Sequence, residues 1–227
     1  MNVILTKPFI SKNQRATLTF PIGSLYLASY LKKNISEIKI KILDPDIFLG
    51  TFEEFIESIV LEKPDIIGIS VFSHIIDETN KTITALKNRL QNAKILIGGS
   101  HLNAVRSDAL MQMPLADYGF YGEGEKGLLE FYAQFSSGNI NLKNIKGLIY
   151  KEDSKILVNA NEYTKDIDEF DPIDYNLINV KTYFQHGSPM GIFRKGNNVA
   201  QIITTRGCPF NCTFCASPVN MGKKVRK

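Results

Sequence analysis

The stretch Pro64-Asp-Ile-Ile-Gly-Ile-Ser70 decides the fold class. Its apolar part, Ile66–Ser70, does not alternate with polar residues, which is typical of a strand buried on both faces of a sheet. Similar runs recur through the first half of the chain and predict four further strands. These are Val3–Leu5, Ile38–Leu43, Lys94–Ile97 and Tyr118–Tyr121.

Amphipathic stretches separate these runs and predict helices. In Thr51–Leu61, for example, Phe52, Phe55 and Ile59 fall on one face, and Thr51 is suited to cap the first turn. Alternating strands and helices predict an α/β fold with a doubly wound, five-stranded parallel sheet. The predicted helices are Ile22–Lys33, Thr51–Leu61, Ile75–Leu90, Ala104–Met111 and Glu125–Phe135.

The pattern changes after Ser136. Gly147–Tyr150 and Ile156–Val158 predict a β-hairpin, and the following polar stretch predicts an irregular connector. Val199–Thr205 then predicts a new strand that leads into a loop rich in cysteine. The predicted organisation is an α/β domain over residues 1–136, a hairpin and connector over 137–198, and the incomplete start of another domain over 199–227.

Composition restricts the classes of protein. The 27 basic and 23 acidic residues give a net charge of only +4 and are mixed along the chain, which does not argue for nucleic-acid binding. No run of 18 apolar residues predicts a membrane span. The segment Met1–Leu5 resembles a buried strand and not a signal peptide. We therefore expect a cytoplasmic protein without membrane partners.

Loops at the predicted carboxyl ends of the strands carry glycine and polar residues. In doubly wound sheets, ligands bind beyond these ends, and glycine allows a ligand to approach the backbone closely. A tight turn without a ligand is the alternative explanation. The loops are Lys7–Phe20, Ser70-Val-Phe-Ser-His74, Gly98-Gly-Ser-His101 and Tyr121-Gly-Glu-Gly-Glu125.

The chain has three cysteines, and all lie in Thr205-Arg-Gly-Cys-Pro-Phe-Asn-Cys-Thr-Phe-Cys215. An odd number of closely spaced cysteines argues against a disulfide framework and for a metal or redox centre. Three thiolates on one short loop can each ligate one iron of a cubane cluster, which leaves the fourth iron open. A structural zinc site is the alternative and would need a fourth ligand, such as His74, His101 or His186. Three buried structural cysteines are a third interpretation.

The spacing Cys-x3-Cys-x2-Cys, with Phe214 before the third cysteine, resembles the signature of radical S-adenosylmethionine (SAM) enzymes. The flanks Thr204-Thr-Arg-Gly207 and Gly222-Lys-Lys-Val-Arg226 match the same family. The resemblance implies a [4Fe-4S] cluster, SAM on its open iron, reductive cleavage of SAM to a 5′-deoxyadenosyl radical, and an electron donor such as flavodoxin or ferredoxin. Phe214 would lie against the adenine of SAM. The implied cluster ligands are Cys208, Cys212 and Cys215.

Four N-terminal segments resemble the Rossmann-like cobalamin-binding domain that precedes many radical SAM domains: Pro21–Leu31, Pro64–Ser70, Gly98–His101 and Gly122–Glu125. The Asp-x-His-x-x-Gly loop that supplies a histidine to cobalt in some such domains is absent. Cobalamin would then bind without that ligand, or not bind at all. The resemblance implies cobalamin contacts from Gly23, Leu25, Ser70, Ser73, Gly98, Gly99, His101, Gly122 and Glu123.

Some of these side chains have a second interpretation. His101 is equally suited to hydrogen bonding within its loop, and His74, at another strand end, is a weaker candidate for a functional role. Glu123 and Glu125 could act as an acid–base pair, but Glu125 is also suited to the first turn of the following helix. Asp44 stands beside a proline at a strand end, which is typical of a turn.

Together the two resemblances predict the N-terminal portion of a B12-dependent radical SAM enzyme, one that transfers methyl groups or modifies a carbon skeleton. Before Lys227 the chain has room only for the first strand and the cluster loop of a partial barrel. We therefore expect this chain to be inactive by itself. The alternative is a module, or a truncated fragment, that binds cobalamin or a partner protein without catalysis. The substrate is not indicated.

Overall fold

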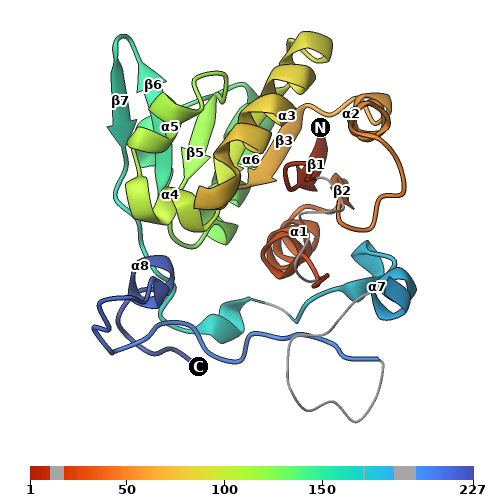
Figure 1. Cartoon of the computed structure of the whole chain (residues 1–227). Helices are drawn as coiled ribbons and strands as arrows, with labels where there is room; N and C mark the ends of the chain where they lie inside the picture. Colours follow the sequence, from red (N-terminus) through yellow and green to blue (C-terminus); the bar gives the residue numbers. More distant parts are fainter. Residues whose placement is uncertain (11–17, 171, 187–197) are drawn as a thin grey trace.

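A seven-stranded sheet forms the centre of the protein (Figure 1). The structure, a computed structural model, describes residues 1–10, 18–170, 172–186 and 198–227. The strand order is β2-β1-β3-β4-β5-β6-β7; β1 to β5 are parallel, and β6 and β7 are antiparallel to their neighbours. The strands are β1 Asn2–Thr6, β2 Lys39–Leu43, β3 Ile66–Ser70, β4 Lys94–Gly98, β5 Tyr118–Phe120, β6 Leu148–Glu152 and β7 Lys155–Val158.

Helices cover both faces of the sheet. One apolar cluster joins one face to α2, α3, α4 and α5, and a second joins the other face to α1 and α6. This arrangement confirms the predicted doubly wound α/β fold. The helices are α1 Ile22–Asn34, α2 Phe52–Leu61, α3 Ile76–Arg89, α4 Ser100–Val105, α5 Asp108–Gln112, α6 Glu125–Ser137, α7 Val180–His186 and α8 Ser217–Met221, with 3-10 turns at Ser73–Ile75, Leu142–Asn144, Ile167–Glu169 and Tyr175–Leu177.

The unalternating strands follow from burial on two faces. On β1, Ile4 packs into the cluster beneath α2 and α3, whereas Val3 and Leu5 pack into the cluster beneath α1 and α6. All three side chains are at most 2% exposed. Because successive strand residues point to opposite faces, a strand with a core on each side requires apolar residues at every position.

The hairpin of β6 and β7 continues the main sheet. Tyr118 of β5 pairs with Tyr150 of β6, so the sheet is extended by two antiparallel strands beyond the predicted five. The helix predicted over Ala104–Met111 is wrong in its bounds, since α4 and α5 are separated around Arg106, whose φ is 49°. Left-handed backbone at a non-glycine residue is incompatible with a continuous helix.

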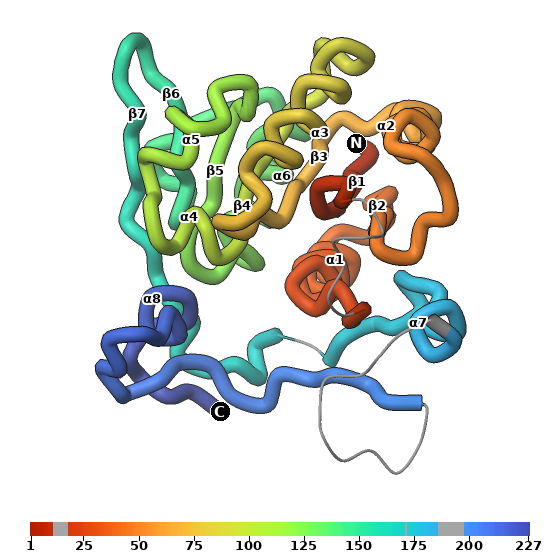
Figure 2. Tube along the Cα trace, in the orientation of Figure 1, coloured from red at the N-terminus to blue at the C-terminus, as the bar shows by residue number. Residues whose placement is uncertain are grey.

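The strand predicted over Val199–Thr205 is not formed. This stretch has no neighbouring strand to pair with, and its backbone instead bonds to side chains: the hydroxyl of Tyr175 donates to the carbonyl of Gln201 at 2.5 Å. The C-terminal segment, blue in Figure 2, runs below the α/β layers and turns back beside α8. Parts of two predicted loops, residues 11–17, 171 and 187–197, lie outside the described residues.

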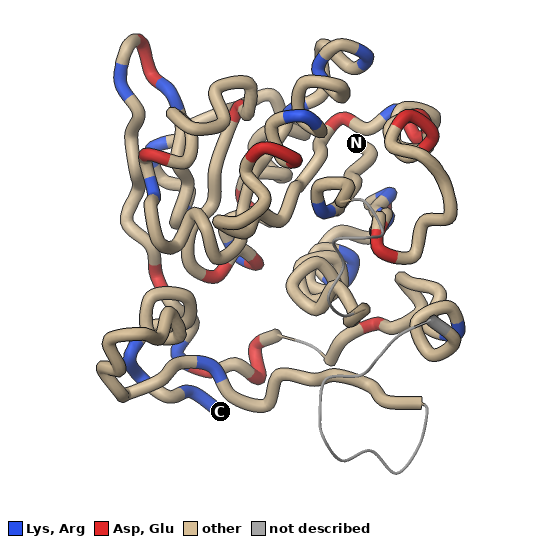
Figure 3. Tube along the Cα trace, in the orientation of Figure 1, with Lys and Arg blue, Asp and Glu red and all other residues tan. Residues whose placement is uncertain are grey.

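Acidic and basic residues are interspersed along the described chain (Figure 3). Within the described ranges, no helix combines the length and apolar character needed to cross a membrane.

Candidate functional site

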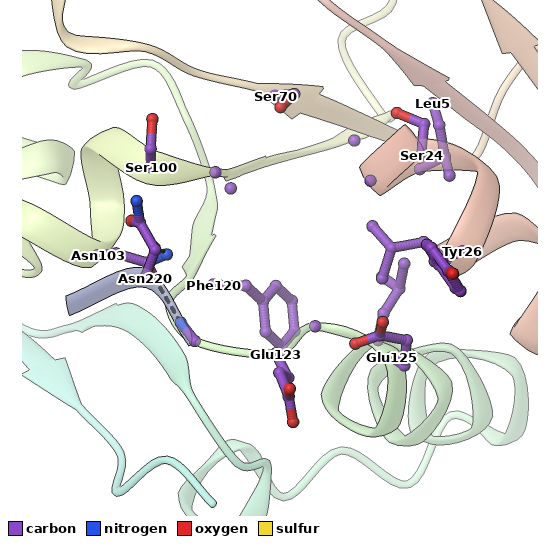
Figure 4. Close-up of a pocket in the computed structure, with 18 of the residues that line it drawn as sticks. Leu5, Ser24, Tyr26, Ser70, Ser100, Asn103, Phe120, Glu123, Glu125 and Asn220 are labelled. Atoms are coloured by element: carbon purple, nitrogen blue, oxygen red, sulfur yellow. Dashed lines mark hydrogen bonds between the residues drawn. The ribbon is translucent and has the colours of Figure 1, made fainter. Parts of the chain in front are cut away.

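A cavity of about 420 Å³ lies at the carboxyl ends of β3, β4 and β5 (Figure 4). The start of α1 and the loop between β5 and α6 form its sides, and residues from the C-terminal segment close it. The residues that line it are Leu5, Gly23, Ser24, Tyr26, Leu27, Gly68, Ile69, Ser70, Phe72, Leu96, Ile97, Gly98, Gly99, Ser100, Asn103, Phe120, Gly122, Glu123, Gly124, Glu125, Leu128, Ile203, Arg206, Asn220 and Met221.

Three glycines shape the cavity wall. A Cβ added to Gly23 would meet no atom within 4 Å, and a Cβ added to Gly98 would meet only the carbonyl of Phe120, at 3.8 Å. Side chains at these two positions would therefore stand in the cavity. Gly99 is required for a different reason, because its φ is +103° and a Cβ would lie 2.9 Å from the carbonyl oxygen of Val71.

Neutral polar groups also line the cavity. Ser70 is the last residue of β3, and Ser100 and Asn103 lie on α4, which follows β4 (Figure 4). Asn103 is held in place: its Oδ1 accepts a hydrogen bond from the amide of Gly122 at 2.6 Å, and its Nδ2 donates to Oδ1 of Asn220 at 3.1 Å. Asn103 thus joins β5 to the C-terminal segment.

The carboxylates on the cavity wall are neutralised by arginines. Arg206 donates to Glu125 at 2.6 Å and lies 3.3 Å from Glu123, while Nη1 of Arg226 contacts both carboxylate oxygens of Glu123 at 2.8 Å. These four side chains are at most 9% exposed. Two negative and two positive charges balance, so the network adds no net charge to the wall.

The guanidinium of Arg206 is buried beside two carboxylates and two aromatic rings. Burial opposes the charge of Arg206, but Glu125 and Glu123 outweigh it and raise the pKa of the guanidinium. Its guanidinium also lies 4.7 Å from the ring centre of Phe170 and 5.1 Å from that of Tyr26. Because Glu123 and Glu125 are held by strong charge-assisted bonds, the arrangement favours a structural role over acid–base catalysis.

The three cysteines lie on a loop that is closed at its base. Arg206 and Arg226 exchange both backbone hydrogen bonds, N to O, at 3.0 and 2.8 Å, as an isolated antiparallel bridge. Inside the loop, the amide of Cys208 donates to the carbonyl of Gly222 at 3.0 Å. The loop requires glycine at Gly207, whose φ is +95° and whose Cβ would lie 2.0 Å from the carbonyl oxygen of Lys224.

The three cysteines form no disulfide and are accessible to different degrees. Cys212 is exposed, and Cys208 and Cys215 are half-buried. Hydrogen bonds with the hydroxyl and the amide of Ser217 lower the pKa of the Cys215 thiol. Phe214, predicted to contact adenine, is 91% exposed.

The structure brings together only some of the side chains predicted to contact cobalamin. Six line the cavity, and three do not: Leu25 is fully buried in the core, Ser73 is exposed, and His101 is 3% exposed. The ring nitrogens of His101 lie 3.0 Å from Oγ of Ser73 and 2.8 Å from Oε1 of Gln112. The six residues on the cavity wall are Gly23, Ser70, Gly98, Gly99, Gly122 and Glu123.

Sequence reasoning missed the part of the wall that comes from outside the loops at the strand ends. Tyr26, Asn103 and Asn220 carried no signal, because nothing in their neighbourhood distinguishes them from other helical polar residues. Arg206 and Arg226 belong to the flanks of the cysteine motif, but no local sequence pattern links them to Glu123 and Glu125.

The cavity and the cysteine loop fit their implied cofactors differently. A cavity with open space at Gly23 and Gly98, a largely apolar wall and a few hydroxyl and amide groups suits part of a large neutral cofactor that carries amide groups. The cysteine loop provides the three thiols that an iron–sulfur cluster requires, but within the described residues no three Cys, His, Asp or Glu side chains converge into a metal-binding group. The thiols are therefore on one loop but not preassembled.

Two curated proteins are similar in sequence to most of this chain. A curated protein of Pyrococcus horikoshii, named as an uncharacterized methyltransferase, is 31% identical over 210 residues, which are 91% of this chain and 42% of that protein. The anaerobic magnesium-protoporphyrin IX monomethyl ester cyclase of Cereibacter sphaeroides is 29% identical over 167 residues, which are 72% of this chain and 26% of that protein. The chain thus spans less than half the length of these relatives.

Among solved structures, the cobalamin-dependent SAM radical enzyme OxsB, with aqua-cobalamin and SAM bound, superposes with a TM-score of 0.79 at 19% identity. The match covers 99% of this chain and 29% of that enzyme, and at this identity it shows a shared fold. The family model of the B12 binding domain matches residues 12–131, which contain the strands and helices that build most of the cavity wall. The chain therefore belongs to the B12-binding domain family.

Proposed function

We propose that this chain binds cobalamin in the cavity at the carboxyl ends of β3, β4 and β5, as the B12 module of a radical SAM enzyme. The observation that carries the proposal is the cavity wall itself, which combines open space at Gly23 and Gly98 with neutral polar groups. Membership of the B12-binding domain family supports the same ligand.

Polar groups on the wall would hold the cofactor. Ser70 and Ser100 offer hydroxyls to its amides, and Asn103 is already oriented by its bonds to Gly122 and Asn220. Among the described histidine side chains, none lines the cavity, so this chain would hold cobalamin without an imidazole on cobalt. When bound, cobalamin supplies a carrier for a methyl group.

The cysteine loop would hold the second cofactor. We propose that Cys208, Cys212 and Cys215 ligate a [4Fe-4S] cluster, with SAM on the open iron and Phe214 against its adenine. Since the thiols do not converge, the loop would have to rearrange as the cluster forms, as is common where metal binding and folding are coupled. The lowered pKa of Cys215 favours the thiolate that iron requires.

The activity we propose for the whole enzyme is methyl transfer or modification of a carbon skeleton, driven by an electron donor such as flavodoxin or ferredoxin. One of the two curated relatives is named as a methyltransferase and the other as a cyclase, which supports both outcomes.

Titration with hydroxocobalamin tests the first part. We expect a change in its visible spectrum and its retention with the protein on gel filtration. Gly98→Leu should abolish retention, because the added side chain fills the cavity. Gln91→Leu, which places the same side chain at an exposed position in the turn before β4, is the control. Failure of the wild-type chain to retain cobalamin would reject the site.

Anaerobic reconstitution with iron and sulfide tests the second part. The reduced protein should give a [4Fe-4S]⁺ electron paramagnetic resonance signal that changes when SAM is added. A variant with all three cysteines changed to serine should give none. Retention of cobalamin without any cluster signal in the folded wild-type chain would favour the alternative function, a cobalamin-binding module without radical chemistry.

A further inference from the structure

Glu123 serves two sites at once. It lines the cavity, and its carboxylate is also the shared acceptor for both arginines at the base of the cysteine loop. Its Oε2 additionally accepts a hydrogen bond from the amide of Thr164 at 2.9 Å. One carboxylate therefore contacts the connector and both ends of the loop.

The guanidinium of Arg226 also has several hydrogen-bond partners, but Arg226 does not line the cavity. Besides Glu123, its Nη1 donates to the carbonyl of Thr164 at 2.8 Å and its Nη2 to the carbonyl of Met221 at 2.6 Å. Its guanidinium lies 5.1 Å from the ring centre of Tyr163. Only a planar group with several donors can make these contacts together, so lysine would keep the charge but lose most of the geometry.

The backbone geometry matches the side chains. Arg206 and Arg226 pair through their backbones, which closes the loop, and their side chains point back to the same turn between β5 and α6. Within the loop, Asn220 and Met221 line the cavity. A change in the base of the loop is therefore transmitted to the cavity wall through α8.

We infer that Glu123 and Arg226 are positioning residues, which fix the cysteine loop against the cavity so that the two sites share one wall. The functional meaning of this inference rests on the proposed function, because it sets where the cysteine site lies relative to the cobalamin site. The ion pair itself is a property of the chain without any cofactor.

Hydrogen–deuterium exchange of the full chain without cofactors tests the inference. Arg226→Met should raise exchange at residues 205–226 by roughly tenfold or more, because a buried carboxylate loses its main partner and the loop opens locally. Arg226→Lys should give a smaller increase, and Glu123→Gln should resemble Arg226→Met. Exchange in β1, β3 and β4 should stay the same.

The matched control is Glu169→Gln, which breaks the exposed ion pair between Glu169 and Lys126, the residue that follows Glu125 on α6. This variant should leave exchange in the loop unchanged. Unchanged exchange of the loop in Arg226→Met would overturn the inference. A uniform increase over the whole sheet would also overturn it, because the network would then stabilise the fold in general.

A second measurement connects the loop to the cavity. Arg226 does not line the cavity, so any effect of its substitution on cobalamin binding is indirect. If the loop positions Asn220 and Met221, Arg226→Met should weaken hydroxocobalamin binding by roughly tenfold. An unchanged dissociation constant together with an open loop would overturn the link to the cavity. If the wild-type chain does not bind cobalamin, the proposed function fails, and the exchange experiment still decides whether the loop is fixed by this pair.

Discussion

Tyr26 and Ile203 exchange hydrogen bonds in both directions. The hydroxyl of Tyr26 donates to the carbonyl of Ile203 at 3.1 Å and accepts from its amide at 3.2 Å. A single side chain on α1 therefore satisfies both backbone groups of a residue that belongs to no strand. Both residues line the cavity, so this contact joins the α/β layers to the segment that leads into the cysteine loop.

Tyr26→Phe should weaken that junction while the ring packing is kept. Two hydrogen bonds to half-buried backbone groups are lost, so we expect the free energy of unfolding to fall by about 1–2 kcal/mol. Urea unfolding followed by circular dichroism measures it. Tyr30→Phe on the same helix, where the ring packs against Phe170, is the control and should change little. Equal stability of Tyr26→Phe and wild type would contradict the junction.

The two left-handed glycines of the cysteine loop should differ in their tolerance of a side chain. Gly207→Ala should disrupt the loop, because its Cβ would collide with the backbone of Lys224, whereas in Gly222→Ala the nearest atoms are those of the Tyr163 ring, at 3.2 Å. In both variants, alanine at positive φ destabilises the folded state by about 1 kcal/mol. We expect tryptic cleavage after Arg206 to be much faster in Gly207→Ala than in Gly222→Ala. Similar rates would refute the predicted collision.

His101 should matter for stability and not for cofactor affinity. Both of its ring nitrogens are within hydrogen-bonding distance of a side chain of the domain, and the ring does not line the cavity. His101→Ala should lower the free energy of unfolding by about 1–3 kcal/mol, since the buried imidazole and its hydrogen bonds with Ser73 and Gln112 are lost. The hydroxocobalamin dissociation constant of the folded variant should equal that of wild type. His74→Ala, at an exposed position, is the control, and a selective loss of affinity in His101→Ala would restore its role as a contact.

The cap of α2 should make stability depend on pH. The amide of Thr51 donates to Glu54, and the Thr51 hydroxyl accepts from the amide of Glu54. The bond from the Thr51 backbone is the main reason that the pKa of Glu54 is lowered. A lowered pKa in the folded state contributes stability above the unfolded value and loses it as pH falls through the folded value. The urea midpoint should therefore fall more between about pH 6 and about pH 3 in wild type than in Glu54→Gln.

In the same series, Thr51→Ala should lower the midpoint at both pH values, because the cap itself is lost. Parallel pH profiles for wild type and Glu54→Gln would show that the charge of Glu54 makes no contribution.

The central sheet could be predicted because each of its strands is buried on two faces and therefore needs an uninterrupted run of apolar residues. Ile66–Ser70 is an example, and the observed β3 has the same bounds. The hairpin was also predicted, but its pairing with β5 was not, because β-strand pairing between distant segments leaves no local pattern. Residues 199–205 have the composition of a strand, yet without a partner strand their backbone bonds to Tyr26 and Tyr175.

The candidate site was predictable where glycine marks a strand end. Gly98 and Gly99 identified one wall of the cavity from the sequence alone. For His101 the sequence left two interpretations open, and its contacts with Ser73 and Gln112 favour hydrogen bonding within the domain over a place on the cavity wall. The partners of Glu123 could not be predicted, because ion pairs across 103 residues depend on the fold.

The long sequence separation between the partners of these ion pairs also bears on the order of folding. Arg206 lies 81 residues from Glu125, and Arg226 lies 103 residues from Glu123, whereas the parallel strands pair across shorter separations, as Val3 does with Ile66. Contacts that close long loops form late, and a chain emerging from the ribosome completes its N-terminal layers first. We therefore expect the part of the wall formed by Ile203, Arg206, Asn220 and Met221 to assemble last. Cofactor loading during synthesis would then precede closure, an order that stopped-flow refolding with and without hydroxocobalamin can test.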